Sequence, residues 1–424
     1  MAENTEVVVI GGGYAGVMAA NRLTRRDDVN VTLINPRRNF VERIRLHQLV
    51  GGSDDAVVDY ATILAGGVRL VVDTVTRIDA AGRRLTLASD TTVRYDYLIY
   101  AVGSGSADQQ VPGAAEHAYP VASLEEAERL RQAVATAPAT AAVTVVGAGP
   151  AGIETAAELA EAGRTVTLVC GGVLGPYLHP RGRRTVARRL AKLGVTVLDG
   201  PDTKVTEVTR HAVRLADGRA LPGELTVWTA GFGVPDLAAR SGLSTDALGR
   251  LLTDETLTSV DDVHIVAAGD SAAPSDLPYR LGCQSAVQLG PQATETVLSR
   301  IAGERPAPVE VGFAGQCLSL GRRVGVFQFS RRNDVAIPLY LGGRPGAKLK
   351  ELVCRSTVRQ LAYEARKPGA RSMWVKDDKR GQLLRAKQEE TRQEEARRDE
   401  AQQDEAQDTA APAARRGMSD RSPR

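Results

Sequence analysis

Cysteine is scarce in this chain of 424 residues, and its spacing excludes two kinds of site. The four cysteines are Cys170, Cys283, Cys317 and Cys354, and no two of them form a CxxC pair. A disulfide framework or a zinc knuckle needs closely spaced cysteines, so neither is expected, and no metal site is predicted. So little use of cysteine fits a reducing compartment, and we expect a cytoplasmic protein.

Long apolar runs and an excess of charge are also missing. No apolar run reaches about 18 residues, so we expect no membrane-spanning helix. The net charge is only +3, which predicts no strong attraction to nucleic acid. The first apolar strand begins close to Met1, which leaves no room for a signal peptide. The length is enough for two or three domains.

Glycine is abundant, with 42 residues, and two groups of glycines share one spacing. The pattern GxGxxG occurs at 11–16 (GGGYAG) and at 147–152 (GAGPAG). Its first glycine permits a tight turn, the second lets the backbone approach a pyrophosphate, and the third lets a helix pack closely on a strand. The following helix N-terminus offers free N–H groups to the phosphates. Two such motifs predict two dinucleotides, with electrons passing between them.

Each glycine motif lies between an apolar strand and an alanine-rich helix, the context in which this motif is informative. In the first unit the strands are expected at 7–10 and 31–34, on either side of the helix. The second unit repeats the plan, with strands at 143–146 and 166–169. The sequence therefore predicts an α/β fold with two Rossmann-type dinucleotide-binding domains.

Composition changes twice toward the C-terminus. Between 312 and 374 we expect a small α+β domain, with a strand near 324–329 and a helix near 348–366. From about Asp377 the chain alternates acidic, basic and glutamine residues with few apolar ones. Such a segment has little to bury, so a disordered charged tail is predicted.

These features resemble the FAD/NAD(P)-linked disulfide reductase superfamily of flavoproteins, the pyridine nucleotide-disulfide oxidoreductases. The resemblance is strongest to the branch of type II NADH dehydrogenases and apoptosis-inducing-factor-like quinone reductases, and it covers about residues 5–375. Beyond the glycines it is carried by VTRID at 75–79, YDYLIYAVG at 95–103, VWTAG at 227–231 and VHIVAAGD at 263–270.

The resemblance implies that FAD occupies the first unit and that NAD(P)H binds a second unit inserted into the first. The expected FAD-binding domain has two parts, 1–115 and 239–305, and the inserted NAD(P)-binding domain is expected at 116–238. A C-terminal domain is expected at 306–376, followed by the tail at 377–424. The residues that it marks as cofactor-binding are Gly11, Gly13, Tyr14, Ala15, Gly16, Asn35, Val75, Ala101, Gly103, Gly147, Gly149, Pro150, Gly152, Cys170, Ala230, Gly231, Gly269 and Asp270. Asp270 is expected to accept a hydrogen bond from the flavin ribityl chain, with a plain helix N-cap as the alternative.

The electron acceptor is indicated by a missing dithiol and by a glutamine motif. Disulfide reductases carry a cysteine pair after the first unit, whereas residues 40–48 here contain none. CQSAVQ at 283–288 resembles the AQxAxQ quinone-site motif of type II NADH dehydrogenases, although Cys283 and Leu289 depart from it. Gln284 and Gln288 are therefore candidates to line a quinone channel, where a neutral amide can bond a carbonyl. The alternative is an ordinary amphipathic helix with surface glutamines.

Glu154 matches a family glutamate that lies near the flavin ring. A buried carboxylate there is expected to have a raised pKa and to transfer protons. The alternative is a first-turn acid that complements the helix dipole. His47 lies in a segment similar to the family's flavin-adjacent "LHE" stretch and is expected mainly to pack.

The acids that usually bind the nucleotide ribose are missing from both units. Asn35 stands where FAD binders usually have Glu or Asp, although an amide can still bond a hydroxyl. Cys170 stands at the matching place in the second unit, where an acid would favour NADH by repelling a 2′-phosphate. Arg181, Arg183 and Arg184 are candidates to reach a phosphate, so the choice between NADH and NADPH stays open.

The expected partners are NAD(P)H and a quinone or other electron acceptor, with no nucleic acid and with a homodimer left open. The helix at 348–363 mixes an apolar stripe with a basic face. It either lies on the inner face of the cell membrane as a peripheral contact or packs its stripe inward. Two rival functions are a soluble reductase feeding an iron–sulfur protein or a small-molecule pathway, and a redox-sensing interaction module.

Overall fold

The computed structural model describes residues 4–107, 110–370, 377, 379–390, 392–393 and 397. The chain divides into two units, residues 1–376 and 377–424, and the fold described here is that of the first. In the second unit residues 380–390 are helical. Most of the segment predicted as a charged tail lies outside the described residues, so its disorder stays a prediction.

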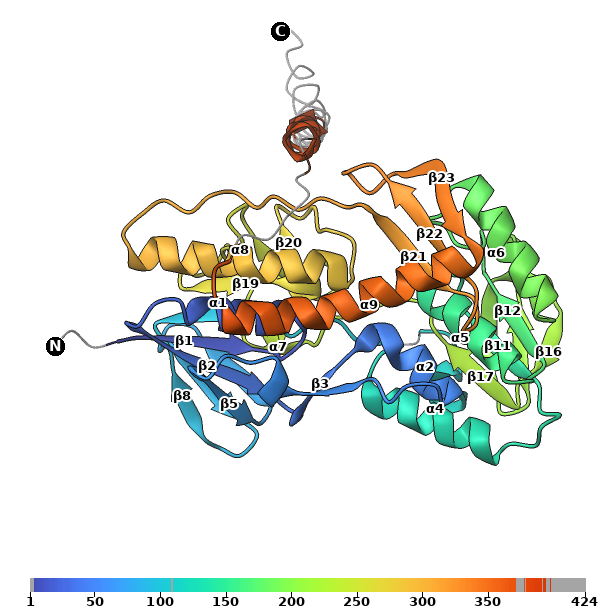
Figure 1. The fold of residues 1–424 in the computed structure, drawn as a ribbon. Helices are drawn as coiled ribbons and strands as arrows, with labels where there is room; N and C mark the ends of the chain where they lie inside the picture. Colours follow the sequence, from blue (N-terminus) through green and yellow to red (C-terminus); the bar gives the residue numbers. More distant parts are fainter. Residues whose placement is uncertain are drawn as a thin grey trace, which may run out of the picture. The chain divides into compact units, whose positions relative to one another are not determined.

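Two five-stranded parallel sheets form the core of the first unit (Figure 1). In spatial order the first sheet contains β19 (Ile265–Ala267), β9 (Tyr97–Tyr100), β1 (Thr5–Ile10), β2 (Val29–Asn35) and β5 (Val68–Val72). The second contains β10 (Ala118–Pro120), β17 (Leu225–Trp228), β11 (Val143–Val146), β12 (Val166–Val169) and β13 (Thr196–Leu198). Both glycine motifs follow the central strand of their sheet, so the predicted α/β fold with two Rossmann-type domains is confirmed.

The helices follow from the local sequence. The Ser123 hydroxyl accepts from the Glu126 N–H while the Glu126 carboxylate accepts from the Ser123 N–H, a reciprocal cap that starts the helix after Ser123. The helices are α1 (Tyr14–Leu23), α2 (Leu46–Gly51), α3 (Ala114–His117), α4 (Leu124–Thr136), α5 (Pro150–Glu161), α6 (Pro180–Lys192), α7 (Leu237–Arg240), α8 (Cys283–Ile301) and α9 (Gly343–Arg366), with 3-10 turns at Arg43–Arg45, Tyr60–Thr62, Pro201–Thr203 and Gly269–Ser271.

Smaller sheets extend from the two cores. Two of them have three antiparallel strands, β6 (Val75–Asp79) with β7 (Arg84–Leu87) and β8 (Thr92–Arg94), and β14 (Val205–Val208) with β15 (Ala212–Leu215) and β16 (Ala220–Pro222). Two have a single strand pair, β3 (Asn39–Val41) with β4 (Val57–Asp59), and β18 (Leu251–Thr253) with β20 (Ala272–Pro274).

The C-terminal part of the unit is an antiparallel sheet followed by the long helix α9. The sheet contains β21 (Gly315–Ser319), β22 (Gly325–Ser330) and β23 (Ala336–Gly342). The strand expected at 324–329 corresponds to β22, and the helix expected at 348–366 corresponds to α9. From β23, α9 runs back across the unit to lie against α1 (Figure 1). It therefore joins the C-terminal sheet to the first dinucleotide-binding sheet.

The apolar stripe of α9 faces inward. Cys354 and Leu361 are fully buried, and the Leu361 carbonyl accepts a hydrogen bond from the Asn21 amide of α1. Of the two alternatives for this helix, inward packing is thus the one observed. None of the described helices combines the length and the apolar character needed to cross a bilayer.

A buried ion pair fixes the C-terminal end of α9. Arg22 Nε of α1 lies 2.8 Å from Glu364 Oε1, and the two side chains are 8% and 3% exposed. Removing one partner would leave the other charge buried alone.

We expect Glu364→Ala to lower the free energy of unfolding by about 3–5 kcal/mol, because Arg22 would lose its buried counter-charge. Urea titration of the full chain measures the change. Arg26→Ala, at a solvent-exposed pair with Asp28, is the matched control and should change little. Equal effects of the two variants would contradict a structural role for the buried pair.

Candidate active site

The first glycine turn is formed by close backbone contacts. Gly11 has a φ of +103°, and a Cβ there would lie 2.2 Å from the Ala101 carbonyl oxygen. A Cβ on Gly16 would lie 1.8 Å from the Gly11 oxygen, so α1 can approach β1 only through this glycine. Around Gly13, by contrast, the space is open.

The start of α1 fits the phosphates of FAD. Gly13 is the N-cap, and in the described part of the chain it offers no side chain to the N–H groups of the first turn, which begins with Tyr14 and Ala15. Uncapped donors beside open space are what a pyrophosphate needs. The residues present therefore fit the cofactor that the sequence resemblance implies.

Asn35 helps to hold the glycine turn. Its Oδ1 accepts from Gly12 N at 3.0 Å, and its Nδ2 donates to the Arg37 oxygen at 2.9 Å. The Tyr60 hydroxyl donates to the Gly12 oxygen at 2.7 Å. The expected ribose contact of Asn35 stays a prediction. Tyr60 was not foreseen, because no motif marks a tyrosine so far along the chain.

Asp270 lies at the C-terminal end of β19 and accepts two hydrogen bonds. The Ser104 hydroxyl donates to its Oδ2 at 2.7 Å, and Gly282 N donates to its Oδ1 at 2.9 Å. An Arg43 nitrogen lies 3.7 Å from Oδ2. The carboxylate thus links the residues after β9 to the start of α8, where Gly269 approaches Ala15.

The other predicted cofactor residues of the first unit lie near the same sheet. Ala101 follows β9, and its N–H donates to the Ile10 oxygen at 2.9 Å. Gly103 has a φ of +73° and open space around it. Val75 begins β6 and is buried with Ile10 in one apolar cluster.

The second glycine turn repeats the first in detail. Gly147 has a φ of +119°, and a Cβ there would lie 2.5 Å from the Thr229 hydroxyl. A Cβ on Gly152 would lie 1.9 Å from the Gly147 oxygen, whereas Gly149 faces open space. Pro150 begins α5, and no side chain caps this helix. The turn therefore fits a second pyrophosphate.

The remaining predicted residues of the second unit lie near the ends of its strands. The Ala230 carbonyl accepts from the Trp228 indole at 2.9 Å, and Gly231 has a φ of +82°. Cys170 directly follows β12, and its N–H donates to the Leu198 oxygen at 2.8 Å.

Glu154 lies in a buried polar cluster formed by three distant parts of the chain. Its Oε1 is 2.9 Å from Lys350 Nζ of α9 and accepts from Ser319 N of β21 at 2.8 Å. Its Oε2 is 3.8 Å from His47 Nδ1 of α2. All three ionisable side chains are less than one-tenth exposed.

The raised pKa expected for Glu154 is wrong. Burial alone would raise the pKa of this carboxyl, but the Lys350 ammonium and the Ser319 N–H favour the ionised form and hold the pKa below its usual value. Burial lowers the pKa of His47 to about 4, so its ring is neutral at pH 7. Glu154 is therefore a fixed anion facing a fixed cation, with a neutral imidazole beside them.

Lys350 was missed by the sequence reasoning, although a signal was present. It stands four residues before Cys354 on the stripe of α9 that points inward. A lysine on the buried side of an amphipathic helix needs a partner charge, and that partner is Glu154. A pocket of about 250 Å³, lined in part by Gln48, Arg322 and Glu351, reaches Lys350.

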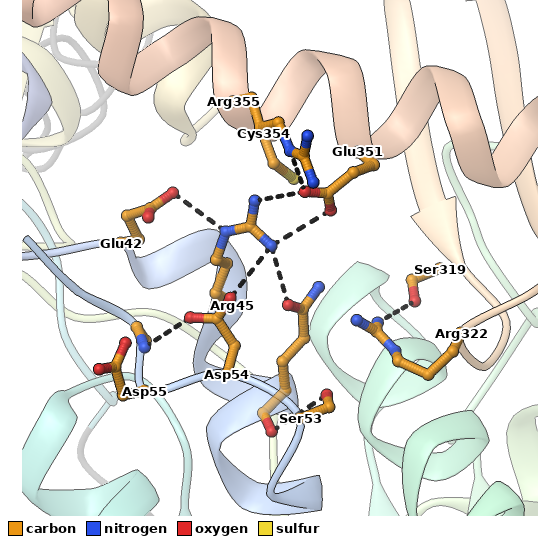
Figure 2. A network of polar contacts seen from close by, with 12 residues as sticks. Glu42, Arg45, Ser53, Asp54, Asp55, Ser319, Arg322, Glu351, Cys354 and Arg355 are labelled. Atoms are coloured by element: carbon orange, nitrogen blue, oxygen red, sulfur yellow. Dashed lines mark hydrogen bonds and ion pairs between the residues drawn. The ribbon is translucent and has the colours of Figure 1, made fainter.

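Arg45 is the centre of a second network next to this cluster (Figure 2). Its guanidinium contacts Glu351 of α9 at 3.0 Å, the Gln48 amide at 3.0 Å and Glu42 at 3.2 Å. Figure 2 shows Arg45 reaching up from the segment before α2 to α9. Together the two networks connect α9 to the segment that also carries His47.

The two predicted quinone-site glutamines bond to the backbone that leads into the C-terminal sheet. Gln288 Nε2 donates to the Gly312 oxygen at 3.0 Å. In the amide orientation that satisfies both of its groups, Gln284 accepts from Ala314 N at 3.0 Å and donates to the Gly315 oxygen at 3.1 Å. Both amides position residues 312–315, and their contact with an acceptor stays a prediction.

Comparison with known proteins agrees with this geometry. Residues 5–296 match the model of the pyridine nucleotide-disulphide oxidoreductase family. The chain belongs to this family. It is 33% identical over 296 residues to an NADH dehydrogenase-like protein of Mycobacterium tuberculosis, covering 63% of this chain and 73% of that protein. It is 28% identical over 351 residues to the type II NADH:quinone oxidoreductase Ndh of the same organism, covering 72% and 74%.

A solved structure has the same fold as this chain. NDH2 of Plasmodium falciparum in complex with NADH superimposes with a TM-score of 0.70 at 16% identity. The match covers 87% of this chain and 99% of that chain. The sequence-based assignment to the superfamily and to its fold is thus confirmed.

Lys350→Met should lower the free energy of unfolding by about 3–5 kcal/mol at pH 7, because Glu154 would remain buried without a counter-charge. Adding Glu154→Gln to this variant should recover part of the loss, since the isolated charge is then removed. Urea titrations of both variants make the comparison. Arg355→Met, at an exposed pair on the same helix, is the control, and an equally large effect there would refute the interpretation.

His47 predicts a pH dependence of stability. The unfolded chain takes up this proton near pH 6.5 and the folded protein only near pH 4, so the unfolded state binds more protons in between. Stability should therefore fall by about 3 kcal/mol as the pH drops through this window. Thermal unfolding of wild type and His47→Asn between pH 4 and 7 measures this contribution. A variant with an unchanged pH profile would contradict the neutral, buried state of His47.

Proposed function

We propose that this protein is an FAD-dependent oxidoreductase that takes hydride from NADH and passes the electrons to a quinone-like, lipophilic acceptor. The observation that supports the acceptor class is an apolar sheet face that ends at the Glu154–Lys350 pair. A lipophilic substrate needs an apolar path, and its reduction is favoured by a fixed positive charge at the inner end of that path.

The apolar face is one side of the C-terminal sheet. Cys317 of β21 lies opposite Phe327 of β22, which lies opposite Leu341 of β23. Residues directly opposite in an antiparallel sheet project from the same face. Phe329 adds a second ring to it, with its centroid 4.8 Å from that of Phe327.

This face runs from solvent toward buried polar groups. Leu341 is 37% exposed and the nearby Leu339 is 58% exposed, whereas Cys317 is half-buried, and burial raises the pKa of its thiol. Ser319, two residues after Cys317 on β21, donates its N–H to Glu154 at 2.8 Å, and Glu154 pairs with Lys350, so the ion pair lies at the end of the strand that carries Cys317.

The chain's own residues then have separate tasks. The two glycine turns would hold the two dinucleotides, and their positioning would supply much of the acceleration. When bound, FAD supplies the two-electron chemistry that links a hydride donor to the acceptor. The Lys350 ammonium stabilises negative charge that develops on a reduced acceptor, and Glu154 keeps that ammonium in place.

Peripheral membrane contact follows from the same face rather than from α9. The exposed leucines of β23 and the neighbouring Val335, which is 54% exposed, give a lipid surface something to contact. An acceptor dissolved in lipid would then enter the apolar face directly. The relatives named as NADH:quinone oxidoreductases support this acceptor class.

Anaerobic stopped-flow measurement of the yellow protein tests the proposal. NADH should bleach the flavin rapidly, and a menaquinone or ubiquinone analogue should restore its absorbance within seconds. Slow reoxidation by every quinone, alongside rapid reduction by NADH, would refute the acceptor and favour a reductase that feeds a protein partner.

Leu341→Glu should slow reoxidation by a lipophilic quinone about tenfold or more, because it places a charge on the apolar path. Reduction by NADH and reoxidation by ferricyanide, which needs no apolar path, should stay unchanged. Leu352→Glu, at an exposed leucine of α9, is the control for adding a surface charge. If both variants behave like wild type with quinone, the sheet face is not the path.

A further inference from the structure

The second dinucleotide site lacks an acid at the position that usually selects the ribose. Cys170 directly follows β12, and no Asp or Glu occurs between it and Pro180. In Rossmann domains a carboxylate at this place bonds the ribose hydroxyls of NADH. The selection of the nucleotide must therefore come from another residue or be absent.

The neighbouring strand supplies a carboxylate at the same edge of the sheet. β12 and β13 are parallel, and Val169 pairs with Leu198. The next residue on each strand is Cys170 and Asp199, and the Cys170 N–H continues the ladder by donating to the Leu198 oxygen at 2.8 Å. Neighbouring parallel strands are about 4.8 Å apart, so Asp199 lies one strand spacing from Cys170.

The loops after the two strands are fastened together. Gly200 N donates to the Gly172 oxygen at 2.7 Å, and Gly171 N donates to the Thr203 hydroxyl at 3.1 Å. These two hydrogen bonds keep Asp199, the residue before Gly200, in place at the edge of the sheet where the nucleotide is expected to bind. Apart from its chain neighbours, no described residue has an atom within 4 Å of a Cβ built on Gly172, so the loop is open on that side.

Asp199 is available to bind a ligand. Its side chain is exposed and makes no hydrogen bond or ion pair with the part of the chain that the structure describes. The carboxylate nevertheless acts on its neighbour: burial and then the Asp199 charge raise the pKa of the Cys170 thiol to about 12. A fixed negative charge is thus present next to the position where the usual acid is missing.

We propose that Asp199 selects NADH over NADPH, by accepting a hydrogen bond from the 2′-hydroxyl of the adenosine ribose and by repelling a 2′-phosphate. The acid thus follows the neighbouring strand β13 instead of β12, at the same C-terminal edge of the sheet. A charge-assisted hydrogen bond of this kind contributes about ten- to hundredfold to affinity.

One cation lies close enough to oppose this selection. A Cβ built on Gly171 would be 3.7 Å from Lys204 Cα, so Lys204 borders the same loop. An ammonium there would attract a 2′-phosphate. Asp199 precedes it, directly at the strand end, and Asp202 adds a second negative charge to the segment. The net charge of residues 199–204 is therefore negative, which favours NADH.

The test is the rate of flavin reduction under anaerobic conditions, with NADH or NADPH as the reductant. Wild type should be reduced more efficiently by NADH, and Asp199→Asn should lower the NADH/NADPH preference about ten- to hundredfold. Asp202→Asn, at the neighbouring acid, is the matched control and should keep most of the preference. Adding Cys170→Glu to Asp199→Asn should restore it, because an acid then stands at the usual place.

Three outcomes would overturn the proposal. They are equal use of both nucleotides by wild type, an unchanged preference in Asp199→Asn, and a preference for NADPH that disappears in Lys204→Ala. Because Asp199 is exposed, the variants are expected to fold, and Cys170→Glu in wild type gives an independent check by raising the preference. This half-reaction uses no acceptor, so a failure of the quinone proposal would leave the result valid.

Discussion

The ion pair between Glu154 and Lys350 is the constraint that holds α5, α9 and β21 together. A carboxylate on α5 and an ammonium on α9 can be buried together only if the two side chains lie within hydrogen-bonding distance of each other. Ser319 N, which completes the coordination of Glu154, fixes β21 to the same point. Two neighbouring C-terminal segments, β21 and α9, are thereby joined to a helix that lies 165 or more residues earlier in the chain.

The pair also determines which groups near it can carry charge. Because Lys350 keeps the pKa of Glu154 low, the cluster is charged and closed rather than ready to release a proton from the carboxyl. His47 stays neutral beside it, since a third charge in so small a buried volume would be unfavourable. The electrostatic character of the proposed acceptor site thus depends on a residue of the C-terminal helix, outside the two nucleotide-binding sheets.

Much of the fold could be predicted from the sequence, because strand, glycine turn and helix occur consecutively. Gly11 and Gly147 are needed because the backbone of each tight turn takes a positive φ, a local requirement, and both residues have a positive φ in the structure. The contacts of the candidate site were harder to predict from the sequence, because they join residues that are far apart in the chain. The partner of Glu154 is Lys350, and the partners of Gln284 are backbone groups of residues 314–315. Only the inward position of Lys350 on its helix carried a signal, and reading it requires knowing which face is buried.

The path of α9 has a consequence for how the protein is made. Its contacts join Arg22 to Glu364 and Glu154 to Lys350, so they close over nearly the full length of the first unit. During synthesis both Rossmann sheets leave the ribosome before α9 exists, and in that interval Glu154 has no cation to face. The nucleotide sites can form early, whereas the proposed acceptor site is completed last. FAD can therefore bind to a growing chain before that chain has a site at which the reduced flavin passes its electrons to an acceptor.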